Sequence, residues 1–509
     1  MNDPTAAAGT PASGKQFLGH PRGLVTLFMM EFFERFTYYG MRAMLVPFLS
    51  AATMAGNPGF GIDEVTANSV YALYTGAAYL GCIPGGWVAD RLIGQRNAVF
   101  YGGLFIAAGN LILAVSTAPP LFYFGLAVIV IGIGLLKPNV SAVVGGLYEG
   151  QSGARRDSGF SLFYMGINLG AFIGPLLAGG LGEKWDWNIG FLTCGIATLL
   201  GAFYFKVSQK HLGHAGDPPV GVPKEQKQRT WGLITILAAA AALGSYLLFT
   251  GENVPTKTVL AHWLFIAEVA LAVAFFGYVL LFGGLNTAEK KRIGVIIVFF
   301  LCAALFWAGF EQQATTFNKF AFDFTDRSLG GGFFTDGSHP ATWYQSINPL
   351  FIIIFAPFFA WVWVALGVRN LDPSAPAKMG LGLVLLGVGF LIMMWAAQLV
   401  VSSGGKVGPV WLLLAYLIHT FGELCLSPVG LSNVTKLAPP KFVGRMMGTW
   451  FLGAAIGNTI AGLAGGHLAA QDTSELPAEF LRMTLIGVGS GVIILLLARP
   501  LRSWIGDAK

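Results

Sequence analysis

Charged residues are scarce in this sequence. Asp, Glu, Lys and Arg together make up 11% of the 509 residues, whereas hydrophobic residues make up 55%. Soluble domains carry roughly 25% charged residues, so this composition excludes a soluble globular protein and indicates an integral membrane protein. Glycine, by contrast, is abundant with 69 residues, which suits membrane helices that pack closely through small side chains.

Cysteine is scarce as well, with four residues that stand singly in apolar stretches and form no CxxC or CxxH spacing. This pattern excludes a disulfide framework and a zinc site, and we expect neither a metal nor an organic cofactor. The sequence also lacks the HExxH and GxSxG motifs of metal-dependent and serine hydrolases. We therefore predict that the protein is not an enzyme, against the alternative of an intramembrane enzyme.

The net charge of +6 does not indicate a nucleic-acid partner, because the basic residues separate by loop. If alternate connections are taken as cytoplasmic, 22 of the 31 Lys and Arg residues fall on that side and 6 on the other. This is the positive-inside pattern, so both termini are predicted to be cytoplasmic. The polar segment 1–22 lacks the short apolar core of a signal peptide.

Fourteen apolar runs of roughly 20 residues follow, each long enough to cross about 30 Å of hydrocarbon. They fall into groups of six, two and six. We predict an all-α polytopic membrane protein with two six-helix bundles, as in major-facilitator transporters, plus two extra helices. The predicted divisions are a tail at 1–22, a bundle at 23–206, a linker at 207–229, two inserted helices with a basic loop at 230–292, a second bundle at 293–499, and a tail at 500–509.

The first predicted span carries charges that lipid does not tolerate, because a central Glu or Arg costs at least ~2.5 kcal/mol there. At about 100° per residue, six of its polar residues fall within roughly 140° of the helix circumference. This face must line a wet cavity or meet charged partners on other helices, which is typical of a transport pathway. The six residues are Glu31, Glu34, Arg35, Tyr38, Tyr39 and Arg42.

Charges within the predicted spans are unbalanced. The set is Arg35, Arg42 and Lys137 against Glu31, Glu34, Glu311 and Glu423. Three bases cannot neutralise four acids, and a buried carboxylate without a partner takes up a proton rather than remaining charged. The excess acid is therefore predicted to accept a proton, with a static ion-pair network that fixes helix register as the alternative.

Two further spans repeat an i,i+4 arrangement of polar groups. Trp307 precedes Glu311 in one, and His419, Glu423 and Ser427 follow one another in the other. His419 could titrate near neutral pH, but a hydrogen-bonded packing histidine is the favoured interpretation. Glu268, in an inserted span, has no basic partner nearby in the sequence, and its role stays open. Further polar or aromatic candidates within spans are Tyr74, Tyr79, Asn168, Asn348 and Trp450.

These motifs resemble the proton-dependent oligopeptide transporter family. Residues 31–40 match its ExxERFxYYG signature, residues 85–94 resemble its GxxxADxxxG element, and residues 163–170 resemble its FYxxINxG element. The likeness runs from about residue 20 to about residue 499, and the two extra spans resemble those of the prokaryotic branch. The histidine in the second span and the large extracellular domain of the animal branch are both absent from the sequence.

The resemblance implies specific roles for individual residues. Proton coupling falls to Glu31, Glu34, Arg35 and Glu311. Two gating ion pairs are implied, Arg42 with Glu311 and Lys137 with Glu423. Substrate contacts are implied at Arg35, Tyr38, Tyr39, Tyr74, Lys137, Asn168, Trp307, Asn348, Glu423, Ser427 and Trp450.

The leading hypothesis is a symporter of the bacterial inner membrane that imports di- and tripeptides with protons by alternating access. The charges alone also favour a zwitterionic ligand, because a basic cluster in the first half and Glu423 in the second offer opposite charges to opposite peptide ends. The alternative is transport of nitrate or another small organic anion on the same scaffold, which would need the basic cluster but not Glu423. The lipid bilayer is an expected partner, and no obligate protein partner is expected.

Overall fold

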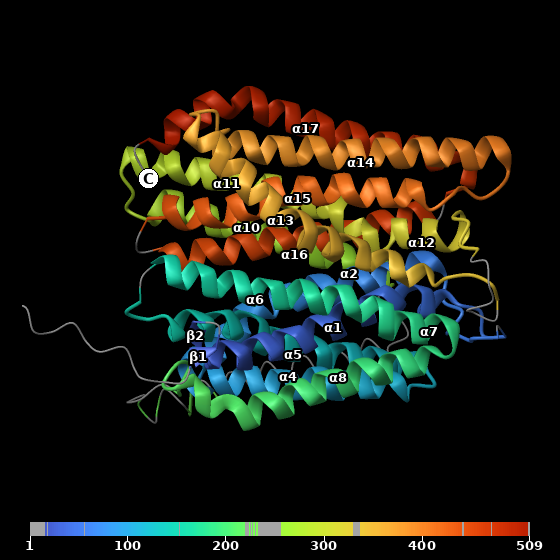
Figure 1. Ribbon diagram of the computed structural model, residues 1–509, viewed down its shortest axis with the longest axis horizontal. Helices are drawn as coiled ribbons and strands as arrows, with labels where there is room; N and C mark the ends of the chain where they lie inside the picture. The colour runs from blue at the N-terminus through green and yellow to red at the C-terminus, as the bar shows by residue number, and fades with distance from the viewer. Residues whose placement is uncertain are drawn as a thin grey trace, which may run out of the picture.

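The computed structural model describes residues 16–17, 19–54, 56–151, 153–218, 256–328, 336–439, 442–469 and 471–506, with a few isolated positions between 223 and 232. Long helices dominate this part of the chain and run side by side along the longest axis of the molecule (Figure 1). A short hairpin of β1 (Gln16–Phe17) and β2 (His20–Pro21) precedes them. The hairpin and the end of the last helix lie at the same end of the molecule (Figure 1), which we call the terminal end; the opposite one is the far end.

The N-terminal bundle comprises residues 23–212. Its elements are α1 (Gly23–Ser50), α2 (Glu64–Leu80), α3 (Cys82–Val88), the π-helix η1 (Ala89–Ile93), α4 (Gln95–Ala114), α5 (Pro119–Leu147), α6 (Gly153–Gly174), the π-helix η2 (Pro175–Gly179), α7 (Gly180–Lys184), α8 (Trp187–Ser208) and the 3₁₀-helix η3 (Gln209–Leu212).

The C-terminal bundle comprises residues 287–505. Its elements are α11 (Thr287–Phe310), the 3₁₀-helix η4 (Glu311–Ala314), α12 (Thr316–Asp323), the 3₁₀-helix η5 (Ala341–Ser346), α13 (Ile347–Val368), α14 (Ala375–Ser403), α15 (Val410–Leu437), α16 (Val443–Ala469), the 3₁₀-helix η7 (Thr473–Glu475) and α17 (Leu476–Ile505). The last helix continues to Ile505, beyond the predicted boundary at 499.

Ten of the described helical segments are long and apolar enough to cross a membrane. Helix α1 falls outside this set because it holds four charged residues among 28, and α2 is divided from α3 at Gly81. Of the two predicted inserted helices, the second is α10 (Lys257–Phe282). The first, predicted near 231–250, lies almost wholly outside the described residues. The predicted all-α membrane architecture is confirmed, whereas the count of fourteen spans is not settled.

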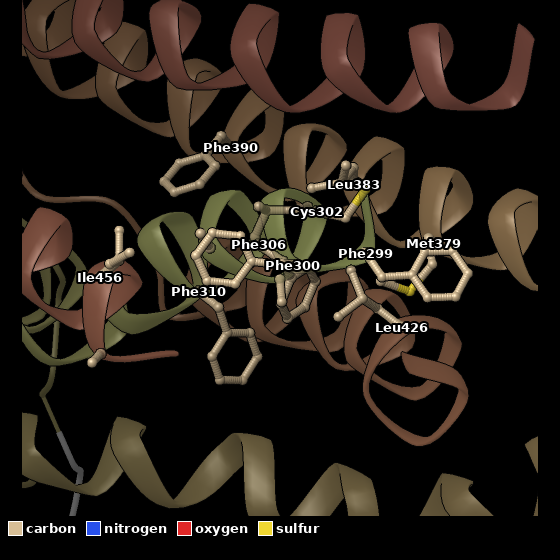
Figure 2. Packing of buried hydrophobic residues seen from close by; sticks show 14 of the residues in the cluster. Phe299, Phe300, Cys302, Phe306, Phe310, Met379, Leu383, Phe390, Leu426 and Ile456 are labelled. Atoms are coloured by element: carbon tan, nitrogen blue, oxygen red, sulfur yellow. The ribbon is translucent and has the colours of Figure 1, made fainter. Parts of the chain in front are cut away.

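Each bundle has its own hydrophobic core. The core of the C-terminal bundle includes Phe299 and Phe306 of α11, Leu383 and Phe390 of α14, and Leu426 of α15, which converge between these helices in Figure 2. A separate cluster of buried residues fills the N-terminal bundle. Two separate cores allow the bundles to move relative to each other without either core being opened.

Glycine brings helices within each bundle into close contact. A Cβ atom on Gly102 of α4 would lie 2.7 Å from the carbonyl oxygen of Gly132 of α5, and one on Gly380 of α14 would lie 2.9 Å from that of Gly491 of α17. No side chain fits at either contact. The abundance of glycine is thus explained by backbone-to-backbone packing, as expected for membrane helices.

Contacts between the bundles gather in the far half of the molecule. Ser346 Oγ donates to the carbonyl oxygen of Phe172 at 2.7 Å, and Trp343 Nε1 donates to that of Leu176 at 3.1 Å. In addition, Glu183 accepts hydrogen bonds of 2.9 Å from the backbone N–H groups of Ala341 and Thr342, the first residues of η5. The structure is therefore closed at the far end.

Candidate functional site

Helix α1 gathers three of the predicted proton-coupling residues on one buried face. Arg35 Nε lies 3.2 Å from Glu31 Oε1, one helical turn away, and the Arg35 guanidinium also binds both carboxylate oxygens of Glu34. All three side chains are at most 5% exposed. One guanidinium thus serves two carboxylates, and Glu31 Oε2 has no hydrogen-bond partner among the described residues. Two of the four acids counted in the sequence therefore share one base on this face.

Arg42, two turns further along α1, forms an ion pair with Glu311 of the C-terminal bundle. Both side chains are at most 5% exposed, so the predicted pairing is present and joins the two bundles. The chain is also irregular here: α11 ends at Phe310, Glu311 begins a 3₁₀ turn, and Thr315 breaks the helix before α12 starts. Short 3₁₀ stretches inside helices often mark functional hinges.

Aromatic rings of α1 lie beside these cations. The Arg35 guanidinium carbon is 5.0 Å from the centroid of the Tyr38 ring, and that of Arg42 is 5.0 Å from the centroid of the Tyr39 ring. Cation–π contacts of this length are attractive, and the two rings meet edge to face with centroids 5.2 Å apart. Both tyrosines therefore pack against the charged groups, as their position on the polar face predicted.

Lys137 and Glu423 do not form the predicted ion pair in this structure. The Lys137 ammonium lies 3.7 Å from the centroid of the Tyr79 ring, whereas Glu423 Oε2 accepts a 2.9 Å hydrogen bond from Asn348 Nδ2. Asn348 is itself oriented by Thr420, whose hydroxyl oxygen lies 3.0 Å away. The hydrogen bonds between the bundles lie in the far half of the molecule. An ion pair between Lys137 of α5 and Glu423 of α15 would require the bundles to approach each other in the terminal half as well.

The remaining predicted contact residues differ in how they are held. Asn168 donates to the carbonyl oxygen of Tyr164 on its own helix at 3.0 Å, which leaves its amide oxygen available. The indole of Trp450 packs against Gly430, which leaves room for the ring, whereas the backbone and Cβ of Trp307 pack against Gly457. Tyr74 lines a narrow space inside the N-terminal bundle together with Glu34 and Tyr38.

Ser427, the last predicted contact, is half-buried on α15, one turn beyond Glu423. His419, one turn before Glu423, is buried: its Nε2 lies 3.0 Å from the carbonyl oxygen of Leu386, and its ring stacks on Phe317. The favoured interpretation of His419 as a hydrogen-bonded packing residue is confirmed.

Glu268 of α10 is also buried and accepts a 3.2 Å hydrogen bond from Thr459 of α16, which gives this carboxyl a partner that the sequence did not reveal.

Sequence reasoning missed the ion pairs at the far end. Arg327 lies 2.9 Å from Glu183, and Lys184 lies 2.6 Å from Asp336; each pair joins the two bundles. A third cation, Lys319 of α12, bonds Glu64 of α2 at 2.9 Å. These residues stand at helix ends and in loops without periodicity. A sequence signal for these pairs does exist: residues of opposite charge stand at the far ends of predicted spans, the acids and bases of a pair belonging to different bundles.

Comparison with known proteins places the chain among transporters. A family model described as the POT family matches residues 96–481. The peptide transporter YePEPT of Yersinia enterocolitica is 40% identical, with 99% of this chain and 98% of that protein covered. A di-/tripeptide transporter of Lactococcus lactis subsp. cremoris is 34% identical, with 97% and 98% covered.

Solved structures agree with these relatives. A crystal structure of the peptide transporter POT in complex with sulfate is similar with a TM-score of 0.88 and 38% identity, covering 96% of this chain and 97% of that one. A POT family transporter in complex with a thioalcohol-conjugated peptide is similar with a TM-score of 0.85 and 32% identity, covering 95% and 98%. The likeness therefore extends over nearly the whole chain.

Proposed function

The chain belongs to the POT family, and we propose that it is a symporter that imports di- and tripeptides together with protons by alternating access. Its relatives are named as peptide and di-/tripeptide transporters, and a similar transporter has been solved with a conjugated peptide bound. Members of this family are transporters, not enzymes.

The observation that carries the proposal is the separation of Lys137 from Glu423. Lys137 stands on the N-terminal bundle without a carboxylate partner among the described residues, and Glu423 stands on the C-terminal bundle with only the Asn348 amide as donor. A peptide offers a carboxylate to the one and an ammonium to the other. Such a ligand replaces the missing ion pair and draws the bundles together at the terminal end.

Side chains of the peptide would meet aromatic rather than charged groups. Tyr39, Trp307 and Trp450 provide broad apolar surfaces, while recognition of the two ends fixes the orientation of the ligand. A site that binds the termini by charge and the side chains by adaptable aromatic contacts tolerates many sequences. We therefore propose Asn168, Asn348, Ser427 and Tyr74 as supporting groups around these end contacts.

Proton coupling follows from the arrangement of the carboxylates. A proton on Glu311 removes the charge that holds Arg42, so the tie between the bundles is lost and the far end can open. On α1, a peptide carboxylate that binds Arg35 competes with Glu31 and Glu34, and a carboxylate without its cation takes up a proton. Peptide and proton then favour the same step, which is the condition for coupled transport.

The distribution of basic residues supports a bacterial inner membrane location with both termini in the cytoplasm. With that orientation, the far end faces the outside, and the described conformation is closed on the outer side. The proton is the only coupling ion that we propose, without an organic cofactor.

Uptake of Ala-Ala into proteoliposomes tests this function. An inward proton gradient should accumulate the dipeptide above its external concentration, and a protonophore should abolish the accumulation. Nitrate belongs in the same experiment as the competing substrate: uptake of nitrate that Ala-Ala does not inhibit, with no dipeptide uptake, would reject the proposal in favour of an anion transporter.

A further inference from the structure

Helix α10 changes bundles along its length. In the far half of the molecule, Thr258 Oγ1 lies 3.0 Å from Ser69 Oγ of α2 in the N-terminal bundle. Toward the other end of the helix, Phe276 meets Phe300 of α11 in the C-terminal bundle edge to face, with ring centroids 5.4 Å apart. Glu268 stands between these two contacts, and the function proposed above assigns no role to it.

The Glu268 side chain lies where α2, α10 and α16 meet. Its Oε1 is 3.2 Å from the Thr459 hydroxyl oxygen of α16. On the other side, a Cβ atom on Gly76 of α2 would lie 3.0 Å from the same carboxyl oxygen and 2.4 Å from the Thr459 hydroxyl oxygen. Glu268 is 0% exposed, and its Oε2 has no hydrogen-bond partner among the described residues. One carboxyl group thus touches both bundles, and only glycine leaves room for it.

No positive charge balances this carboxyl group in the part of the chain that the structure describes, where its only electrostatic partner is the Thr459 hydroxyl. Segment 230–256, most of which lies outside the described residues, contains no Lys, Arg or His. A carboxylate without a cation is costly in an apolar interior, whereas its protonated form carries no charge to desolvate. The surroundings of Glu268 therefore favour the carboxylic acid.

Other titratable groups on α10 and on the helices packed against it stand away from Glu268. Along α10, His262 lies six residues before it, about 9 Å by the rise of an α-helix, and bonds the carbonyl oxygen of Thr258. On α16, His467 lies eight residues beyond Thr459, about 12 Å by the same rise. None of the remaining ones contacts Glu268; they are Lys257 and Tyr278 of α10, Glu64, Tyr71, Tyr74 and Tyr79 of α2, Arg445 of α16, and Glu289, Lys290, Lys291, Arg292 and Cys302 of α11.

Glycines on α16 show where the contact between the bundles ends. In the far half, a Cβ atom on Gly462 would lie 2.6 Å from the Cβ of Ala72 on α2, so the two bundles are in direct contact there. Toward the terminal end, a Cβ atom on Gly457 would instead lie 2.5 Å from the Cβ of Trp307 in its own bundle. Glu268 bonds α16 between these two levels, at the edge of the contact between the bundles.

We propose that Glu268 is a further proton-binding site of this protein, separate from the carboxyl groups of the central site, and that it holds its proton while the far end is closed. In the closed arrangement, α2 and α16 cover the carboxyl group and exclude water from it. The proton removes the negative charge, and Oε1 still accepts the hydrogen bond from Thr459.

Opening of the far end changes this site, a step that rests on the alternating access proposed above. Helix α2 has to separate from α16 for the far end to open, because the two helices are in contact there. Separation uncovers the carboxyl group, and the water that enters takes the proton and solvates the carboxylate. The closed state thus binds this proton more tightly than the open state, so by linkage the proton favours the closed far end.

Infrared difference spectroscopy of the purified protein at pH 7 tests the proton directly, because a glutamate side chain in water is ionised at this pH. The spectrum of the wild type minus that of Glu268→Gln should contain the carbonyl band of a carboxylic acid and no carboxylate band. Carboxylate bands in this difference would overturn the proposal. Glu268→Met, which has a similar volume and no charge, gives the same comparison if the glutamine variant does not fold.

A cysteine reporter at the far end tests the link to opening. Ser50→Cys in a cysteine-free background reacts faster with a water-soluble maleimide when the far end opens, and the ratio of the rates with Glu268 and with Glu268→Gln cancels the ionisation of the thiol itself. The ratio should rise at least about threefold from pH 5 to pH 7, because only the glutamate ionises in the open state. Thr459→Val is the matched control: it removes the hydrogen bond but keeps the carboxyl group, so the rise should persist. A ratio that is constant with pH would overturn the proposed link.

These two measurements separate the inference from the proposed function, since neither contains a substrate. A carboxylic acid band together with a pH-dependent ratio supports the site even if Ala-Ala is not transported. A carboxylate band or a constant ratio rejects it even if proton-driven uptake of Ala-Ala is found.

Discussion

Asn348 donates a hydrogen bond of 2.9 Å to Glu423, and a Thr420 oxygen 3.0 Å away holds the same amide in place. The Glu423 carboxylate is thereby oriented on the C-terminal bundle without a cation beside it among the described residues. Lys137, its predicted partner, rests instead on the Tyr79 ring. The two charges that a zwitterion would bridge are both present and both available.

We expect Glu423→Gln to weaken binding of Ala-Ala by about tenfold to a hundredfold, because a hydrogen bond between charged groups contributes about 1.5–3 kcal/mol. An analogue in which hydrogen replaces the amino group should lose little. Competition against labelled Ala-Ala by both compounds measures the difference. An equal loss for both compounds would show that Glu423 does not receive the amino terminus.

Glu31→Gln is expected to separate peptide movement from proton movement. The amide cannot exchange a proton, so gradient-driven uptake should fall at least about tenfold, within the range of typical coupling energies. Exchange of Ala-Ala across the membrane without a gradient needs no net proton transfer and should partly survive. Counterflow and gradient-driven uptake measured on the same proteoliposomes make the comparison, and an equal loss of both would point to a role in binding or folding.

The ion pair of Arg42 with Glu311 should hold the far end closed. Glu311→Gln removes the charge but keeps the shape, and we expect a single cysteine introduced by Ser50→Cys in a cysteine-free background to react with a water-soluble maleimide at least about fivefold faster. Arg42→Gln should act in the same direction. Unchanged reactivity in both variants would mean that the other contacts at the far end suffice for closure.

The outer pair of Lys184 with Asp336 should not sense physiological pH. The hydrogen bond from Lys184 lowers the pKa of Asp336 from 3.8 to about 2. A carboxyl with a lowered pKa contributes its stabilisation above pH 3.8 and loses it as the pH falls toward 2. We therefore expect Asp336→Asn to change the reactivity of the cysteine reporter by a constant factor between pH 5 and 8; a factor that varies across this range would contradict the assignment.

Glu268 is expected to stabilise the position of α10 through Thr459 of α16. Thr459→Val removes the donor and should lower the free energy of unfolding in detergent by about 1 kcal/mol, the usual contribution of one hydrogen bond. Glu268→Gln retains an acceptor of the same shape and should cost less. A larger loss for the glutamine variant would indicate that the carboxyl group has a role beyond this bond.

The sequence predicted the first helix well, because a helical period places its polar residues on one face. The structure confirms that Arg35 meets Glu31 and Glu34 there. The pairing of Arg42 with Glu311 joins residues 269 positions apart and came from the family resemblance, since periodicity says nothing about partners on another helix. The break in the helix at Glu311 was also not predicted, because no proline stands near Glu311 to mark the end of a helix.

Other features depend on geometry that a sequence does not encode locally. Lys137 and Glu423 were expected to pair. They stand on different bundles, so the distance between them depends on how the two bundles lie relative to each other, and in this conformation they bind other groups. Glu268 gained its partner only because α10 packs beside α16. The far-end pair of Arg327 with Glu183 connects a loop to a short helix and leaves no periodic signal.

Peptide-driven proton movement tests the central claim most directly. Proteoliposomes without an imposed gradient, loaded with a pH indicator and clamped at zero membrane potential, receive Ala-Ala on the far side. We expect acidification of the interior that follows peptide entry in time and is lost in Glu31→Gln. Entry of the peptide with no change of internal pH would contradict it.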